Sequence, residues 1–270
     1  MKKQRLDTLL VELDLCDSRQ QAQRLIRAGE VMVNQQVIDK PGTEVDTSAQ
    51  IQIKQRSPYV SRGGEKLAKA LESFDIPVQG RICLDGGIST GGFTDCLLQA
   101  GAKLVYGVDV GYGQVDWGLR NDPRVILKER TNLRYLTPAQ LYGDGEVPDL
   151  GVVDVSFISL AKILPAFWNL LQPPREAVLL VKPQFEVGKE RVGKKGVVRD
   201  TDDHVRAIAS VLQAAQQLGW HYRGLTWSPV TGPAGNIEYL LWLVMDSQTV
   251  SADLSTIFAI AQSAKAALTP

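Results

Sequence analysis

Two acidic residues and a lysine stand where their side chains should meet. Asp154 and Lys182 end two apolar, strand-like runs, 150–154 and 177–182. The carboxyl ends of parallel strands meet at one edge of a sheet, which is where ligands bind. Glu238 begins a later strand whose short Pro- and Gly-rich connection predicts an antiparallel hairpin, so its start lies at that same edge. Such a group can accept, donate and stabilise protons.

Lys66 is predicted to join this group from a helix. The helix begins near Ser61 and buries an apolar stripe, which Lys66 borders at about 100° per residue. Its ammonium can therefore be partly buried. Neither of the two histidines, His204 and His221, lies at the predicted edge. Lysines and carboxylates must then perform the proton transfer that histidine usually performs.

A glycine-rich segment follows the strand-like run 82–85 and begins a helix, as in loops that let backbone approach a ligand closely. Thr90 replaces the third glycine of the Gly-x-Gly-x-x-Gly pattern, which favours a nucleoside without pyrophosphate over a nicotinamide cofactor. A purely structural strand–helix turn is the alternative. The candidate cofactor-binding residues here are Asp85, Gly87, Ser89, Thr90, Gly91, Gly92 and Phe93.

Asp109 supports the prediction of a nucleoside cofactor. It ends the next strand-like run, 104–109, about 24 residues after Asp85. A carboxylate at this place can accept hydrogen bonds from both ribose hydroxyls of an adenosyl group. Strand-like and helix-like runs alternate from Cys83 onward, which predicts an α/β fold with a mainly parallel sheet.

Residues 1–55 are predicted to form a separate, small α+β domain. Its first helix has a leucine stripe that we expect to be buried, consisting of Leu6, Leu9, Leu10 and Leu13. A second helix begins after Ser18, a good N-cap, and ends at Gly29. Short β segments follow, separated by turns.

The polar side of the second helix is cationic. Arg19, Gln23 and Arg27 recur every four residues with Arg24 adjacent, which suits RNA phosphates or a solvated surface. The segments 18–22 and 27–34 resemble the S4-type RNA-binding domain, and the match covers nearly all of residues 5–53.

A linker is predicted at residues 56–61. Pro58 disfavours helix at Ser57 and stiffens the segment. The second domain then spans residues 62–270.

The whole chain resembles the TlyA-type family, historically labelled hemolysins, whose second domain is similar to FtsJ-type ribose methyltransferases. The motifs that carry this resemblance are 60–67, 89–94, 109–114, 129–132, 154–160, 182–189 and 232–239.

The resemblance implies a Rossmann-like methyltransferase that depends on S-adenosylmethionine. It also implies that the enzyme modifies a ribose 2'-hydroxyl of ribosomal RNA, and that its substrate is either the free RNA or a ribosomal subunit. The family's Lys-Asp-Lys-Glu tetrad falls on Lys66, Asp154, Lys182 and Glu238. Further cofactor contacts fall on Arg130, Thr131, Asn132 and Asp154. The implied acceptors of the methyl group are cytidines of the large subunit, with the small subunit as a second target.

The proposed chemistry needs an in-line nucleophile and removal of the hydroxyl proton. We expect Lys182 to accept or stabilise that proton, with Asp154 and Glu238 orienting the two lysines. Two ammoniums ~4 Å apart repel by roughly 4 kcal/mol at an effective dielectric of ~20, before carboxylates offset the repulsion. Lys66 would thus disfavour a second ammonium beside it.

A basic, glycine-rich loop at 188–196 follows the predicted edge and is expected to contact RNA, a solvated charged loop being the alternative. The candidate RNA-binding residues of the chain are Arg5, Arg19, Arg24, Arg27, Arg62, Lys189, Arg191, Lys194 and Lys195.

Composition excludes several classes of protein. The 270 residues carry no net charge, so RNA binding must depend on local charge. The three cysteines are far apart, and we expect neither disulfides nor a metal site. No apolar run reaches about 18 residues, which predicts that the protein does not span a membrane. The scattered cysteines, and the acidic residues that interrupt any apolar region after the first five residues, predict a reduced, cytoplasmic protein. A monomer is expected.

Two other functions compete with the methyltransferase hypothesis: an inactive RNA-binding adaptor and a membrane-damaging toxin. The toxin is disfavoured because no segment suited to insert into a membrane is evident.

Overall fold

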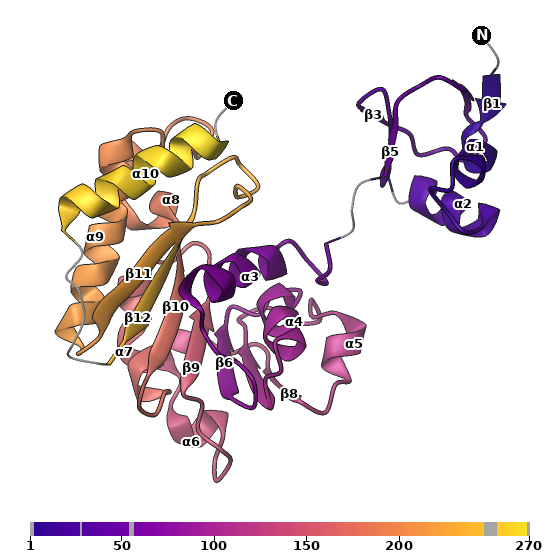
Figure 1. The fold of residues 1–270 in the computed structure, drawn as a ribbon. Helices are drawn as coiled ribbons and strands as arrows, with labels where there is room; N and C mark the ends of the chain where they lie inside the picture. Colours follow the sequence, from indigo (N-terminus) through magenta and orange to yellow (C-terminus); the bar gives the residue numbers. More distant parts are fainter. Residues whose placement is uncertain (1–2, 28, 54–56, 246–252, 269–270) are drawn as a thin grey trace. The chain divides into compact units, whose positions relative to one another are not determined.

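The computed structural model describes residues 3–27, 29–53, 57–245 and 253–268. The chain divides into two compact units, Met1–Ser57 and Pro58–Pro270 (Figure 1). The predicted linker, 56–61, starts at a residue outside the described ranges. From Pro58 onward it packs on the second unit, because the Val60 N–H donates to Asp95 (2.8 Å) and the Gln99 amide donates to the Pro58 carbonyl (2.9 Å).

The first unit places two helices beside short strands. Its elements are β1 (Lys3–Arg5), α1 (Leu6–Glu12), α2 (Arg19–Arg27), β2 (Val31–Val33), β3 (Gln36–Val37), β4 (Glu44–Asp46) and β5 (Ile51–Ile53). The strands form an antiparallel β3-β2-β5 sheet and a β1-β4 pair. Strand β1 was not predicted.

The core of the first unit confirms three of the four predicted leucines. Leu6, Leu9 and Leu10 are buried against α2, whereas Leu13 is 47% exposed. The prediction for Leu13 was wrong because α1 ends at Glu12 and the chain turns at Asp14, which has a φ of 54°. The stripe therefore ends before its fourth member.

The second unit is built on a seven-stranded sheet with the order β11-β12-β10-β9-β6-β7-β8. The strands are β6 (Ile82–Gly86), β7 (Leu104–Val108), β8 (Val125–Lys128), β9 (Leu150–Val153), β10 (Glu176–Val181), β11 (His221–Trp227) and β12 (Tyr239–Val244). Strand β12 runs antiparallel to both neighbours, which confirms the predicted hairpin. The edge strand β8 was not predicted; its Ile126 is 38% exposed.

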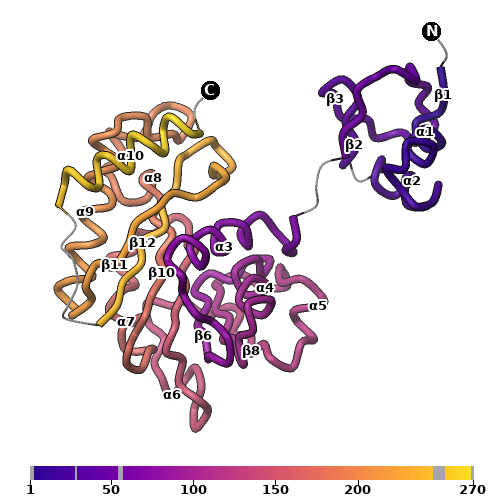
Figure 2. The backbone as a smooth tube through the Cα atoms, viewed as in Figure 1, coloured from indigo at the N-terminus to yellow at the C-terminus, as the bar shows by residue number. Residues whose placement is uncertain are grey.

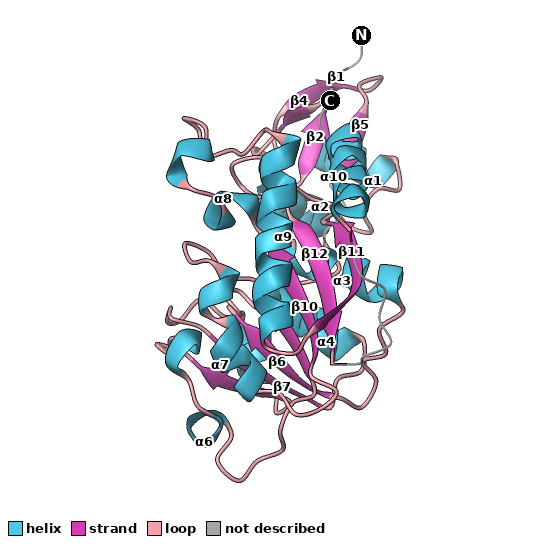
Figure 3. Cartoon of the chain, turned by 90° about the vertical axis from the view of Figure 1, so that its left-hand side faces the viewer, coloured by secondary structure: helices cyan, strands magenta, loops and turns pink. Residues whose placement is uncertain are grey.

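Helices cover both faces of this sheet (Figures 1 and 3). They are α3 (Gly63–Phe74), α4 (Gly92–Gln99), α5 (Trp117–Arg120), α6 (Pro138–Leu141), α7 (Leu164–Asn169), α8 (Pro183–Glu186), α9 (Thr201–Gln217) and α10 (Leu254–Leu268). Consecutive residues of β10 point to opposite faces of the sheet. Leu179 packs with α7, α9 and α10 on one face, and Leu180 packs with α3 and α4 on the other. This burial on both faces explains the continuous apolar run of β10. None of the helices in the described ranges is both long and apolar enough to cross a membrane.

Candidate active site

The glycine-rich loop between β6 and α4 adopts a backbone conformation that favours glycine at two positions. Gly87 and Gly91 have φ angles of 91° and 101°. A Cβ on Gly87 would overlap the carbonyl oxygen of Asp154, and one on Gly91 would overlap Leu119. The loop thus lies directly against the residue that follows β9, which brings the glycines and Asp154 into one site.

The helix that carries Lys66 is held close to this loop. A Cβ built on Gly92 would lie 2.8 Å from the backbone nitrogen of Gly64 and 3.1 Å from the Cα of Gly63. The absence of side chains at these positions lets the first turns of α3 and α4 touch (Figure 2). Lys66 therefore reaches the sheet edge from α3.

Asp109 directly follows β7 and anchors the loop. Its two carboxylate oxygens accept backbone hydrogen bonds, from Ser89 (2.8 Å) and from Gly111 (2.7 Å). A carboxylate has further acceptor capacity beyond these two bonds. Asp109 can therefore still accept hydroxyl donors of a ligand.

Two cavities meet at the carboxyl edge of the sheet and share Gly87, Ser89 and Asp154. The larger is about 500 Å³, within the range of small-molecule sites. Its polar wall includes Asp109, Thr131 and Asn132, and its apolar wall includes Leu133, Val155, Ile158 and Ile163. The smaller, about 210 Å³, contains Thr90, Gly92, Phe93, Arg62 and Lys66. An adenosyl group, with an apolar base and a polar ribose, matches the larger cavity.

Three predicted cofactor residues line neither of these cavities: Asp85, Gly91 and Arg130. Asp85 is fully buried beneath the loop and lines neither cavity; its Oδ2 accepts from the Thr94 hydroxyl (2.7 Å), and its Oδ1 has no partner. Burial raises the pKa of Asp85 to about 7. Arg130 stacks on Tyr112, with its guanidinium carbon 4.1 Å from the ring centre, and lines a third cavity with Tyr135.

The four tetrad residues form two separate ion pairs. Lys66 Nζ lies 2.6 Å from Glu238 Oε2, and Lys182 Nζ lies 2.5 Å from Asp154 Oδ1. Lys66, Lys182 and Glu238 are buried. Buried charges persist where they are paired and hydrogen-bonded. Because Lys66 and Asp154 both line the smaller cavity, the two pairs lie around the same space.

The sequence analysis did not identify Ser156 and Phe185, which neighbour Lys182, or Phe157, which packs on Phe185. The Ser156 hydroxyl accepts from Lys182 Nζ (3.0 Å). Phe157, which is 91% exposed and has a φ of 66°, packs against Phe185 with ring centres 5.1 Å apart. The Lys182 ammonium lies 6.0 Å from the Phe185 ring centre. These residues belong to two of the motifs that carry the family resemblance, 154–160 and 182–189. The motifs therefore marked the region, but they gave no role to these three side chains.

The basic loop after α8 is fixed at two points. The side chain of Asn236 donates to the Gly196 carbonyl (2.8 Å) and accepts from the Val198 N–H (3.0 Å). Arg191 is paired with Asp203 of α9 (2.6 Å). Lys189, Lys194 and Lys195 are exposed. Of the predicted RNA contacts in this loop, Arg191 therefore has a structural partner, and the three lysines face solvent.

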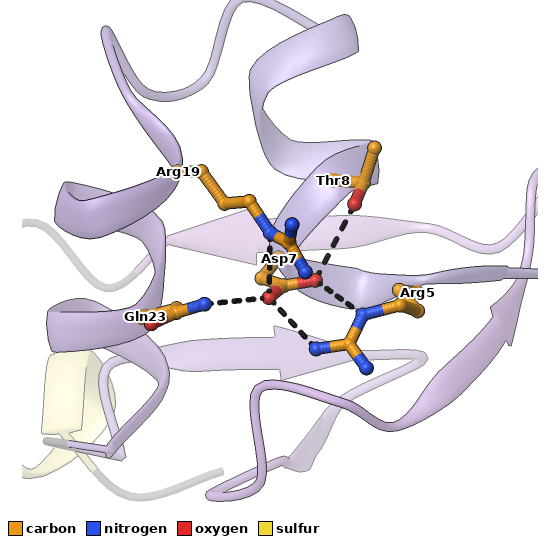
Figure 4. Close-up of polar contacts among 5 residues, drawn as sticks. All are labelled: Arg5, Asp7, Thr8, Arg19 and Gln23. Atoms are coloured by element: carbon orange, nitrogen blue, oxygen red, sulfur yellow. Dashed lines mark hydrogen bonds and ion pairs between the residues drawn. The ribbon is translucent and has the colours of Figure 1, made fainter.

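In the first unit, the predicted cationic stripe on α2 is exposed at Arg19, Arg24 and Arg27. Gln23 and Arg19, however, both donate to Asp7 of α1, as does Arg5 from β1 (Figure 4).

Known protein families match both parts of the chain. The FtsJ-like methyltransferase family matches residues 59–245, and the S4 domain matches residues 4–51. The chain is 50% identical to the 16S/23S rRNA (cytidine-2'-O)-methyltransferase TlyA of Mycobacterium tuberculosis, over 90% of both chains. It is 40% identical to Hemolysin A of Brachyspira hyodysenteriae, over 89% of this chain and all of that one.

A solved structure of a Streptococcus thermophilus protein described as a hemolysin matches with a TM-score of 0.77 and 41% identity, covering 99% of this chain and 97% of that chain. The predicted Rossmann-like methyltransferase domain and S4-type domain are therefore confirmed. This chain belongs to the FtsJ-like methyltransferase family, whose members are S-adenosylmethionine-dependent enzymes.

Proposed function

We propose that this enzyme methylates the ribose 2'-hydroxyl of a cytidine in large-subunit ribosomal RNA, with small-subunit RNA as a second acceptor. The observation that carries the proposal is the presence of two buried lysines, each paired with a carboxylate, around a cavity that adjoins a nucleoside-sized one. The S4 domain supports an RNA substrate. The name of the Mycobacterium tuberculosis relative supports the 2'-hydroxyl of cytidine as acceptor. Such a substrate places the reaction in the cytoplasm, where ribosomes are made.

S-adenosylmethionine supplies a methyl group bonded to a positively charged sulfur. In our proposal Asp109 holds the ribose hydroxyls, and Thr131 and Asn132 line the same wall. The glycines of the 86–92 loop leave room for the remainder of the ligand. This assignment requires no phosphate-binding group, in keeping with Thr90 in place of a third glycine.

Lys182 is our candidate for proton acceptor. In its amine form Nζ takes the proton of the ribose hydroxyl while the oxygen forms its bond to the methyl carbon and the carbon–sulfur bond breaks. Asp154, 2.5 Å away, and the Ser156 hydroxyl then stabilise the resulting ammonium. Lys66 and Glu238 complete the wall of the site and keep the hydroxyl in line.

Phe157 and Phe185 are our candidates for holding the target base. An exposed aromatic ring with a positive φ is unusual for a bulky residue, and strained exposed residues concentrate at ligand sites. The pair lies beside Lys182, within reach of the same nucleotide. Stacking of a base on an aromatic ring contributes about 1–3 kcal/mol.

The test is transfer of labelled methyl from S-adenosylmethionine to separated ribosomal subunits, naked ribosomal RNA and a sample without RNA. We expect label on ribose with the wild type and none with Lys182→Ala, which should still bind the cofactor in a calorimetric titration. Lys103→Ala is the matched control, because the ion pair of Lys103 with Glu146 is exposed. Cofactor binding without transfer to any RNA would instead favour the inactive adaptor. Loss of cofactor binding in Lys182→Ala would make Lys182 a binding residue.

A further inference from the structure

Asp7 is a charged residue in an unusual position. It lies in the first turn of α1 and is completely buried. Arg5 donates to it through Nε (3.1 Å) and Nη2 (3.0 Å), Arg19 through Nε (3.0 Å) and Gln23 through its amide (2.9 Å). Figure 4 shows these donors converging on one carboxylate from β1 and α2.

This carboxylate stays ionised. Hydrogen bonds from Arg5 hold the pKa of Asp7 well below its usual range, against the opposing effect of burial. A buried carboxylate is tolerated only when it is paired, so the two guanidiniums are held beside it. Gly42 backs the guanidinium of Arg5: a Cβ there would lie 3.2 Å from Nη1. Both arginines are therefore restricted to one arrangement.

The outward side of this cluster is cationic. The anion is 0% exposed, whereas the side chains of Arg5 and Arg19 are 48% and 55% exposed. Arg19 uses only Nε for Asp7, which leaves both of its terminal NH2 groups as donors, and Arg5 keeps Nη1. Two fixed, half-exposed guanidiniums beside each other match the oxygens of a phosphate.

We propose that Asp7 is a positioning residue for RNA, holding Arg5 and Arg19 as a preformed two-arginine site for a backbone phosphate. The inference rests on the proposed RNA substrate. Preorganisation lowers the entropy lost when long cationic side chains become ordered on binding. Asp7 therefore strengthens the binding of a polyanion although its own charge repels one.

The charge of Asp7 alone should weaken RNA binding, whereas its positioning of the arginines should strengthen it, so the two effects can be told apart. Asp7→Asn and Glu12→Gln each remove one negative charge from α1, but Glu12 is exposed and its loss leaves the arginines in place. Binding of naked ribosomal RNA is measured for both by titration at fixed salt. We expect Glu12→Gln to bind as tightly as the wild type or more tightly. Asp7→Asn should bind about tenfold more weakly, the loss expected for one hydrogen bond to a charged group.

Steady-state kinetics distinguish positioning from a role in catalysis or folding. Asp7→Asn should raise KM for RNA and leave kcat and cofactor affinity unchanged. Ile26→Val, a core change in α2 that leaves the arginines untouched, controls for lost stability: at a matched fall in Tm it should bind RNA normally. In an Arg5→Gln/Arg19→Gln background, Asp7→Asn should weaken RNA binding no further.

The outcomes are separable. If Asp7→Asn binds RNA as tightly as Glu12→Gln, or if Ile26→Val weakens binding equally, the inference is overturned while the proposed function stands. If the wild type binds no ribosomal RNA, the proposed function falls and this inference with it.

Discussion

The ammonium of Lys66 lies 2.6 Å from a carboxylate oxygen of Glu238, 172 residues away in the sequence. This contact joins α3 to the residue that precedes β12. Both side chains are buried, and the carboxylate is almost completely excluded from solvent. The pair therefore links two segments that are distant in the sequence, and its lysine lines the cavity of the site.

We predict that breaking this pair on one side costs more than removing both charges. Lys66→Met leaves Glu238 as an unpaired buried charge, which typically costs about 3–5 kcal/mol, while the double variant Lys66→Met/Glu238→Gln should recover part of that loss. Urea unfolding of the wild type, both single variants and the double variant measures the coupling. Strictly additive losses would show that the pair makes no net contribution. Methyl transfer should be lost in all three variants.

The stability of the protein should carry a pH dependence due to Asp85. Its folded pKa is raised from 3.8 to about 7 by burial, so the stability it contributes is fully present below pH 3.8 and is lost as the pH rises through 7. Linkage bounds this loss at about 4 kcal/mol. Asp85→Asn keeps an acceptor for the Thr94 hydroxyl but cannot ionise. Urea unfolding between pH 4.5 and 8 should show a flatter profile for Asp85→Asn; parallel profiles would contradict the prediction.

Gly87→Ala should impair the cofactor site through overlap, beyond the strain of its backbone. A Cβ at Gly87 meets the Asp154 carbonyl, whereas one at Gly80, with a φ of 77°, meets nothing within 4 Å. Gly80→Ala therefore isolates the cost of a positive φ, about 1 kcal/mol. We expect both variants to lose stability and only Gly87→Ala to lose S-adenosylmethionine affinity by tenfold or more. Calorimetric titration measures this, and equal affinities would be evidence against the assigned loop.

Phe157→Ala should weaken use of RNA without affecting the cofactor. Loss of one stacked base corresponds to about 1–3 kcal/mol, or roughly 5- to 150-fold in kcat/KM for RNA. Phe157→Tyr keeps the ring and is the matched control. The measurement is single-turnover methyl transfer at varied RNA concentration. If Phe157→Ala has wild-type kinetics, the exposed aromatic pair has another role.

Several features could be predicted from sequence because they depend on local pattern. Apolar runs ending in Asp154 and Lys182 placed those residues at one edge, since a parallel sheet has only one carboxyl edge. Glycines were expected where the chain passes from β6 into α4, and Gly87 and Gly91 have positive φ there. The S4-type and methyltransferase domains were recognisable from short motifs.

Other features were decided only when distant segments packed together. Sequence placed two lysines and two carboxylates in one region, but not that Lys66 pairs with Glu238 and Lys182 with Asp154. It placed Arg19 on a polar helix face and named Arg5 as an RNA contact, but it did not identify the buried Asp7 that holds both arginines. Periodicity reports which face of an element is apolar; the partner of a polar side chain depends on which other segment packs there. Burial and charge pairing are set by that tertiary contact, and they determine the chemistry of this site.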